Sequence, residues 1–169
     1  MKFIAPIVSS LALVASAAVI ERAPVVDAPG YYVHDANTGV TEFFPKRDLQ
    51  NLAARDTASA QWTETKCIDA VGDRGENDRS KNALLDQGFR PSRGVGKNQW
   101  FYAFDGRTVS FLCSYGGNVV SEGAFNDAFD AVYRACGNRH GHQEFGKDFY
   151  IGHTFRGDHF CAGDFHPSK

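Results

Sequence analysis

The apolar positions between Ser121 and Gly137 recur at helical spacing and predict the clearest helix of the chain. Together they form one stripe, which consists of Ala124, Phe125, Ala128, Phe129, Val132, Tyr133 and Cys136. Ser121 is a suitable N-cap, and Gly137 is a suitable residue to end the helix. A small domain has few other places to find a core, so we expect this stripe to be a core face.

A second helix is expected over Glu76–Gln87, where a short apolar patch lies just before Gly88. Asp78 is its expected N-cap, and Gly88 is expected to end it in the left-handed conformation. Gly72 and Gly75 argue against a helix that begins earlier.

Alternation of apolar and polar residues, the period of a strand, occurs before, between and after the two helices. The expected strands are Gln61–Cys67, Gln99–Phe104, Arg107–Tyr115, Lys147–Thr154 and Asp158–Phe165. Asp105-Gly106 is the expected hairpin turn between the second and third of them, and Arg156-Gly157 between the last two. The stretch 91–96 is expected to be a loop, because proline, serine and glycine dominate it.

This order of elements predicts an α+β fold, a two-layer sandwich with two helices on one face of an antiparallel sheet. Two tandem strand–helix–strand units with right-handed crossovers form a ferredoxin-like split βαβ arrangement. In that arrangement the end of the first strand and the end of the second helix lie at the same end of the sheet. The pairing Cys67–Cys136 with Cys113–Cys161 follows from this model.

The competing bond Cys113–Cys136 is disfavoured by length. It would cross a helix of roughly 22 Å, whereas the Cα atoms of a disulfide lie within roughly 7 Å. Sequence alone allows three pairings of four cysteines, so our choice depends on the predicted fold.

The N-terminal residues 1–18 are predicted to be a signal peptide. Lys2 provides a basic start, the next residues are almost all apolar, and Ala15-Ser16-Ala17 supplies small residues for a cleavage site. We see no second apolar span in the sequence, so we expect a secreted, extracellular protein without a membrane span. The four cysteines are then expected to form disulfides.

Residues 19–56 contain no cysteine and are predicted to be a pro-segment or a loosely ordered N-terminal region. Lys46-Arg47 is a dibasic pair of the kind that kexin-type proteases cut, and its alternative interpretation is a solvated surface pair. Within the segment, 31–33 and 40–44 are expected to pair as a hairpin, and this hairpin would dock the segment if it stays attached. Residues 57–169 form the predicted disulfide-bridged domain.

The charges are nearly balanced, with 18 Lys and Arg against 20 Asp and Glu and a net charge of −2. A protein that binds nucleic acid or an anionic membrane through its charge usually has a basic excess. We therefore expect no nucleic-acid partner, and we expect a monomer without a cofactor.

Four features of the cysteine-containing region match a known group of proteins. They are Cys67 before a helix, the strand 111–115 around Cys113, a helix that closes on Ala135-Cys136-Gly137, and Cys161 near the C-terminus. With the signal peptide and the dibasic pair, they make the chain resemble small secreted fungal effectors, in particular killer-toxin-like and necrosis-inducing effector domains. This resemblance implies action on a host or competitor protein or cell-surface component, by binding rather than by bond cleavage.

The histidines late in the chain suggest a small secreted hydrolase, such as a ribonuclease, as the alternative. Such an enzyme needs two histidines, or a histidine and a glutamate, with an arginine to stabilise phosphate charge. The residues that would supply this set are His140, His142, Glu144, His153, Arg156 and His159. An extended His140-Gly141-His142 segment would place two imidazoles on one side. The simpler interpretation is a glycine-rich surface loop without a catalytic or metal-binding role.

Overall fold

The computed structural model describes residues 30–45, 63–86, 93–161 and 165. Within them, the helices are α1 (Arg74–Leu84) and α2 (Glu122–Cys136). The strands are β1 (Gly30–Asp35), β2 (Val40–Pro45), β3 (Glu64–Val71), β4 (Arg93–Val95), β5 (Gln99–Asp105), β6 (Thr108–Ser114), β7 (Asn118–Val120), β8 (Arg139–Phe145) and β9 (Phe149–Phe155). The predicted signal peptide, Lys46-Arg47 and Gly88 lie outside the described residues.

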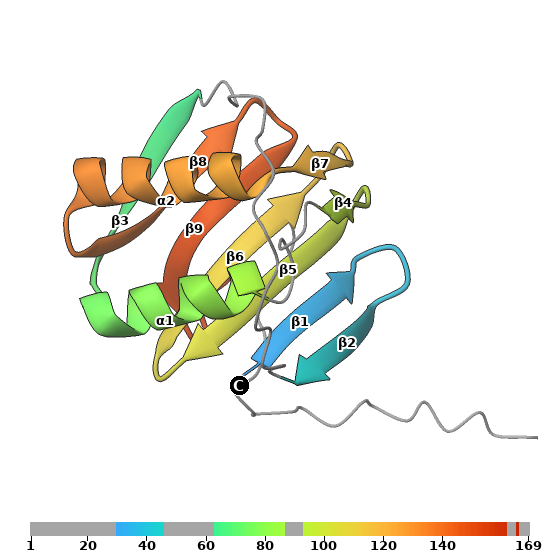
Figure 1. Cartoon of the computed structure of the whole chain (residues 1–169), viewed down its shortest axis with the longest axis horizontal. Helices are drawn as coiled ribbons and strands as arrows, with labels where there is room; N and C mark the ends of the chain where they lie inside the picture. The colour runs from blue at the N-terminus through green and yellow to red at the C-terminus, as the bar shows by residue number, and fades with distance from the viewer. Residues whose placement is uncertain (1–29, 46–62, 87–92, 162–164, 166–169) are drawn as a thin grey trace, which may run out of the picture.

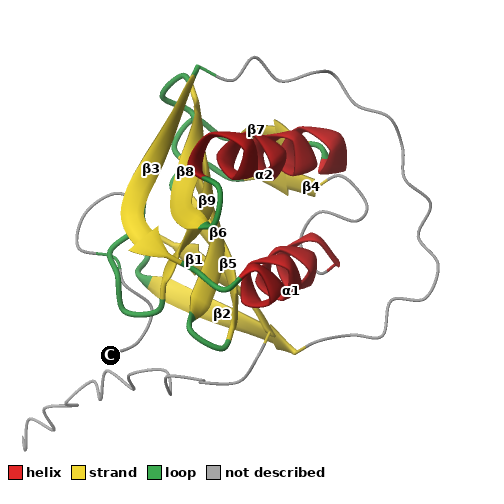
Figure 2. Ribbon diagram, turned by 90° about the vertical axis from the view of Figure 1, so that its left-hand side faces the viewer, coloured by secondary structure: helices red, strands yellow, loops and turns green. Residues whose placement is uncertain are grey.

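Seven strands form one antiparallel sheet in the order β2-β1-β5-β6-β9-β8-β3. Both helices lie on the same face of this sheet, and Figure 1 and Figure 2 show the helices and the sheet as two layers. β4 and β7 pair separately, so residues 93–95 of the predicted loop 91–96 are a short strand. The α+β class and the placement of both helices on one face are confirmed.

The ferredoxin-like split arrangement is not confirmed. β3 lies at an edge of the sheet and pairs with β8, and β9 lies between β8 and β6. The N-terminal hairpin of β1 and β2 extends the opposite edge beyond β5. The difference arises from the final hairpin. The sequence predicts it over Lys147–Thr154 and Asp158–Phe165, whereas in the structure it consists of β8 and β9, so β8 is an additional strand between β9 and β3.

The final hairpin joins β8 to β9, with paired residues from Gly141↔His153 to Phe145↔Phe149. Gly146, with a φ of 55°, occupies the turn between them in a conformation that glycine adopts without strain. The segment 139–145 is therefore a largely buried strand rather than a glycine-rich surface loop. A turn does occur at residues 156–157, but the described residues between 158 and 165 form no strand.

The N-cap of α1 is Asp73 rather than Asp78. The Asp73 side chain accepts a hydrogen bond of 2.8 Å from the backbone N–H of Glu76. Gly75 lies in the first turn, where backbone N–H groups have no intrahelical acceptor, so it does not interrupt the helical hydrogen bonds. Asp78 instead accepts a hydrogen bond from Tyr133 of α2.

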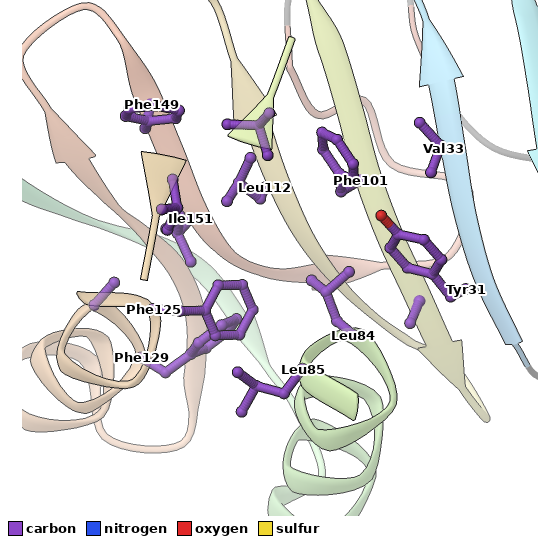
Figure 3. Packing of buried hydrophobic residues seen from close by; sticks show 14 residues of the cluster. Tyr31, Val33, Leu84, Leu85, Phe101, Leu112, Phe125, Phe129, Phe149 and Ile151 are labelled. Atoms are coloured by element: carbon purple, nitrogen blue, oxygen red, sulfur yellow. The ribbon is translucent and has the colours of Figure 1, made fainter. Parts of the chain in front are cut away.

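The apolar stripe of α2 packs against the sheet as predicted. Ser121 caps its N-terminus by accepting from the N–H of Ala124 at 3.1 Å, and Gly137 ends the helix with a φ of 65°. Phe125 and Phe129 meet Leu112 and Ile151 of the sheet in a core that includes Leu84 of α1 and its C-cap residue Leu85 (Figure 3). This core holds both helices on the sheet by burial of apolar surface.

The opposite face of the sheet, called the far face below, is lined by aromatic residues. Its buried members are Tyr32, Trp100, Tyr102, Phe104, Val109, Phe111, Cys113 and Phe160. Phe160, from the segment after β9, stacks on Phe111 with ring centroids 4.8 Å apart. The C-terminal segment therefore covers part of the far face.

The two predicted disulfides, Cys67–Cys136 and Cys113–Cys161, are confirmed. Their Cα atoms lie 5.5 and 5.3 Å apart. The first joins the edge strand β3 to the end of α2, and the second joins β6 to the C-terminal segment on the far face. Gly141 lies close to the first bond, where a Cβ atom would be 3.1 Å from the sulfur of Cys136.

Candidate functional site

The six residues of the predicted hydrolase site lie in three separate places. His140 and His153 lie between the sheet and the helices. His142 and Glu144 lie on the far face. Arg156 and His159 follow the end of β9. The structure brings His140 near His153 and His142 near Glu144, but it does not gather the six residues into one cleft.

His153 belongs to a chain of hydrogen bonds that links the sheet to both helices. Its Nδ1 atom lies 2.8 Å from the Ser110 hydroxyl, which lies 2.6 Å from the Ser80 hydroxyl of α1. Its Nε2 atom lies 3.1 Å from the hydroxyl of Tyr133, which donates to Asp78 at 3.0 Å. These hydrogen bonds satisfy polar groups inside the core.

His140 is fully buried beside this chain. Its Nε2 atom lies 3.2 Å from Oδ1 of Asn77, which also accepts from the Thr108 hydroxyl at 3.2 Å. Gly72 lies so close to the imidazole that a methyl group at this position would overlap it. Burial lowers the pKa of His140 and lowers that of His153 much further, so both imidazoles are neutral at neutral pH. We infer a structural role for both.

His142 and Glu144 lie on the far face, in a group of residues that we call the polar–aromatic patch. The patch consists of Lys66, Tyr115, His142, Glu144 and Tyr150. His142 and His140 therefore do not lie on the same side of the sheet. The register of β3 and β8 shifts between Cys67 and Val71, opposite the start of β8, and the simple alternation expected of an extended segment fails there.

The charged part of the patch is built on the pairing of β3 with β8. Lys66 lies directly opposite His142, and Glu64 lies opposite Glu144. The Glu144 Oε1 atom accepts a hydrogen bond from the Lys66 ammonium at 2.6 Å and lies 3.2 Å from Nε2 of His142. Glu64 lies 3.6 Å from the Lys66 ammonium on the outer side. One ammonium thus stands between two carboxylates.

These contacts fix the charges of the three groups. The hydrogen bond from Lys66 lowers the pKa of Glu144, and the same bond raises the pKa of Lys66. Burial lowers the pKa of His142, although Glu144 opposes this effect. At neutral pH the patch therefore holds a carboxylate, an ammonium and a neutral imidazole. Since Glu144 can only accept, His142 donates through Nε2 and keeps Nδ1 as an acceptor.

Aromatic rings continue the patch towards β5. The His142 ring stacks on Tyr150 at 5.4 Å, and Tyr150 meets the edge of Tyr115 at 5.1 Å. Trp100 follows, 5.0 Å from the Tyr115 ring. Both tyrosines are partly exposed, whereas Trp100 is buried. Partial burial raises the pKa of Tyr115, so its hydroxyl stays protonated and can donate and accept hydrogen bonds.

Arg156 lies away from the patch. The Arg156 guanidinium lies over the Phe104 ring at 4.5 Å, and His159 is exposed in the following segment. Gly152 is the β9 residue opposite His142, and Arg156 comes four residues later. At about 3.3 Å per residue, this is about 13 Å along the strand. The arginine expected to stabilise phosphate charge is thus not beside the His142–Glu144 pair.

A cleft of about 300 Å³ lies at the N-terminal end of α1. Its lining residues are Val71, Gly72, Asp73, Glu76, Arg107 and Phe155. Both carboxylates are engaged in the fold: Asp73 caps α1, and Glu76 accepts from the backbone N–H of Arg107 at 3.1 Å. None of the six predicted residues lines this cleft, and its charges are mixed.

Sequence analysis missed Lys66, Tyr115 and Tyr150 as members of a site. Lys66 and Glu64 are two residues apart in a predicted strand, so the sequence already indicates that their charges share one face. Its position beside His142 depends on pairing between β3 and β8, which are far apart in the sequence. The same holds for the contact between Tyr115 and Tyr150, because it joins β9 to the residue after β6.

Within the described ranges, no three His, Cys, Asp or Glu side chains are grouped so that they could hold a metal ion. In the same residues, no helix has the length and apolar character needed to cross a membrane. Comparison of the chain with protein families, with curated protein sequences and with solved structures gives no match. The site must therefore be interpreted from its own chemistry.

Proposed function

We propose that this chain is a secreted effector- or toxin-like protein that binds a host or competitor protein or cell-surface component through the polar–aromatic patch. The observation that carries the proposal is the Lys66–Glu144–His142 cluster beside two partly exposed tyrosines. Tyrosine rings combine an apolar body with a polar tip, and aromatic residues are enriched in binding interfaces. The two disulfides are compatible with an oxidising extracellular environment.

The charges of the patch give it specificity for a partner with a particular arrangement of charge. Glu64 and Glu144 flank Lys66, so the patch offers acceptors on both sides of one donor. Side-chain exposure is 49% for Lys66 and 58% for Glu64, but 11% for Glu144. A partner would meet Lys66 and Glu64 first, while Glu144 holds Lys66 in position.

Binding is favoured over bond cleavage because a full catalytic set is not assembled around the patch. His140 and His153, two of the predicted catalytic residues, belong to the core network. Arg156 packs on Phe104. The remaining pair, His142 and Glu144, has a lysine as its only charged neighbour of positive sign among the described contacts.

A second candidate, a small hydrolase, is supported by one specific observation. The hydrogen bond from His142 to Glu144 orients the imidazole and leaves Nδ1 free to accept a proton as a general base. Lys66 would then stabilise negative charge on the substrate. This set lacks an assigned general acid, which is why we rank it second.

The proposal is tested with Lys66→Ala and a matched control, Arg79→Ala. Each change removes an exposed cation that is hydrogen-bonded to a carboxylate, Glu144 at 2.6 Å or Asp105 at 2.9 Å. Lys66 also lies 3.6 Å from Glu64, whereas Arg79 lies on α1, away from the patch. We expect Lys66→Ala to weaken the inhibition of candidate host or competitor cells about tenfold, and Arg79→Ala to leave it unchanged. Equal effects of the two changes would remove the patch from the proposal.

The hydrolase candidate is tested in parallel with RNA as substrate. If the parent protein cleaves RNA and His142→Gln loses this activity while remaining folded, the enzyme interpretation replaces the binding interpretation. Inhibition of candidate cells by the parent, with no RNA cleavage, supports binding.

A further inference from the structure

The N-terminal hairpin is an integral part of the sheet. β1 pairs antiparallel with β5 over five residue pairs, from Tyr31↔Ala103 to Asp35↔Gln99. Tyr31 is fully buried on the helix side, where its ring lies 6.0 Å from that of Phe101. The hairpin therefore shares the core of the domain although it lies in the predicted pro-segment.

On the far face, the hairpin completes the aromatic layer. The Tyr32 ring stacks on Tyr102 with centroids 4.9 Å apart and planes 6° apart, and lies 5.1 Å from Phe104. His34 meets Phe165 at 4.3 Å, so the hairpin also contacts the C-terminal segment. Burial raises the pKa of Tyr32 to about 12. Without the hairpin, Tyr102 and Phe104 of β5 would lose this cover.

The turn of the hairpin is held by the turn before β5. The backbone N–H of Ala36 donates to the carbonyl of Asn98 at 2.9 Å. The Asn98 side-chain amide donates to Oδ1 of Asn37 at 3.0 Å, and the Asn37 amide donates to the Lys97 carbonyl at 3.3 Å. These bonds fix the register of β1 on β5 independently of the strand pairing.

Covalently, the hairpin is joined to the domain only through residues 46–62. β2 lies at one edge of the sheet, and β3, the next strand in the sequence, lies at the other. The chain has no cysteine before Cys67, so no disulfide ties the hairpin to the domain. Lys46-Arg47 directly follows Pro45, the last residue of β2, which pairs with Gly30. Hydrolysis after Arg47 would thus break no strand pair.

We propose that cleavage after Arg47 converts the protein into two non-covalently associated chains, in which the N-terminal hairpin remains on β5. The step is peptide hydrolysis by a protease specific for dibasic pairs: water adds across the Arg47–Asp48 bond and leaves a carboxylate on Arg47 and an amine on Asp48. The N-terminal segment is then a structural subunit rather than a discarded pro-segment. This inference does not depend on the proposed function.

Retention follows from what departure of the hairpin would expose. β5 would become an edge strand with unpaired backbone groups, and such an edge pairs readily with other chains. The rings of Tyr102 and Phe104 would lose the stacked ring of Tyr32. Cleavage alone removes only the tether, which lowers the effective concentration of the hairpin at its site. The contacts themselves are unchanged.

The test uses the full chain, purified in its uncut form and treated with a kexin-type protease. We expect denaturing mass spectrometry to detect two chains that meet between Arg47 and Asp48, and native mass spectrometry to detect one complex with the mass of the uncut chain plus one water. The control Lys46→Gln/Arg47→Gln should stay a single chain. Failure of the folded parent to be cut, or separation of the two chains under native conditions at micromolar concentration, would overturn the proposal.

A second variant separates retention by specific contacts from retention by chance. Tyr32→Ser removes the stacked ring on β5 but leaves the backbone pairing. Before cleavage we expect this variant to remain folded, because the tether keeps the hairpin at its site. After cleavage we expect its hairpin to dissociate at a concentration at least about tenfold higher than in the parent. Identical dissociation of parent and variant would show that the stacked ring of Tyr32 does not hold the hairpin on β5.

Discussion

The Ser110 hydroxyl lies 2.8 Å from Nδ1 of His153, and neither side chain is exposed. The two residues lie directly opposite each other on β6 and β9. A serine beside a histidine activates a nucleophile in many hydrolases, but such a serine must touch its substrate. Here Ser80 of α1 covers Ser110 at 2.6 Å. The pair therefore holds two layers together and does not form a catalytic dyad.

This assignment predicts a large stability effect for changes in the pair. Ser110→Ala should lower the free energy of unfolding by about 1–3 kcal/mol, because His153 loses a buried hydrogen-bond partner. His153→Ala should cost more, since it also leaves a cavity. Urea denaturation of the purified variants measures both effects. Asp127→Ala, at an exposed position of α2, is the control and should stay within about 0.5 kcal/mol of the parent. Losses no larger than in the control would contradict a structural role.

Stability should decrease on acidification. Burial lowers the pKa of His140, His142 and His153 from the ordinary 6.5. Below pH 6.5 the unfolded chain thus binds more protons than the folded one, so the contribution of the neutral imidazoles is complete above this pH and declines as the pH falls. The pKa of Glu144 is lowered from 4.5, so its contribution is lost only below that pH. Denaturant titrations between about pH 4 and 8 check this order, and a stability that rises below pH 6.5 would refute it.

The neighbours of His142 should shift its pKa in opposite directions. Glu144 favours the imidazolium through its hydrogen bond and charge, whereas Lys66 disfavours it by repulsion. Glu144→Gln should therefore lower the pKa of His142, and Lys66→Ala should raise it. NMR titration of the histidine ring protons measures both shifts. If the two variants moved the pKa in the same direction, the three groups would not form the cluster described here.

Removing either disulfide should lower the free energy of unfolding by about 4 kcal/mol. The two bonds close loops of 69 and 48 residues, and the expected losses are similar because the entropic cost of loop closure varies slowly with loop length. Only loss of Cys113–Cys161 should free the C-terminal segment from the far face. The double variants Cys67→Ala/Cys136→Ala and Cys113→Ala/Cys161→Ala separate these effects. At a pH where both double variants are folded, we expect only Cys113→Ala/Cys161→Ala to bind more of an apolar dye than the parent.

The sequence predicted those elements whose signals are local. α2 has an unbroken apolar stripe between a serine cap and a terminal glycine, and both ends agree with the structure. The hairpin of β5 and β6 has a glycine turn between alternating runs, and it was predicted within two residues at each end. The disulfide pairing was correct because it needed only the relative positions of β3 and the end of α2.

The remaining elements depend on contacts that are distant in sequence. β8 contains two histidines, a glutamine and a glutamate in seven residues, so its composition does not resemble that of a buried strand. The partner of the buried His140 is Asn77 of α1, which is 63 residues away in the sequence. The polar–aromatic patch arises where Lys66 meets His142, and no local pattern encodes that meeting.

The position of the N-terminal hairpin also constrains the order of events during synthesis. Tyr31 pairs opposite Ala103, so its partner strand leaves the ribosome about 70 residues later. At 5–20 residues per second this delay is roughly 4–14 s. A lone two-stranded hairpin is at best marginally stable, so Tyr31 and Tyr32 must remain unpacked throughout that interval. β1 is thus synthesised early but cannot pack until β5 has emerged. Nascent chains should therefore depend on chaperones that shield this aromatic segment during the interval.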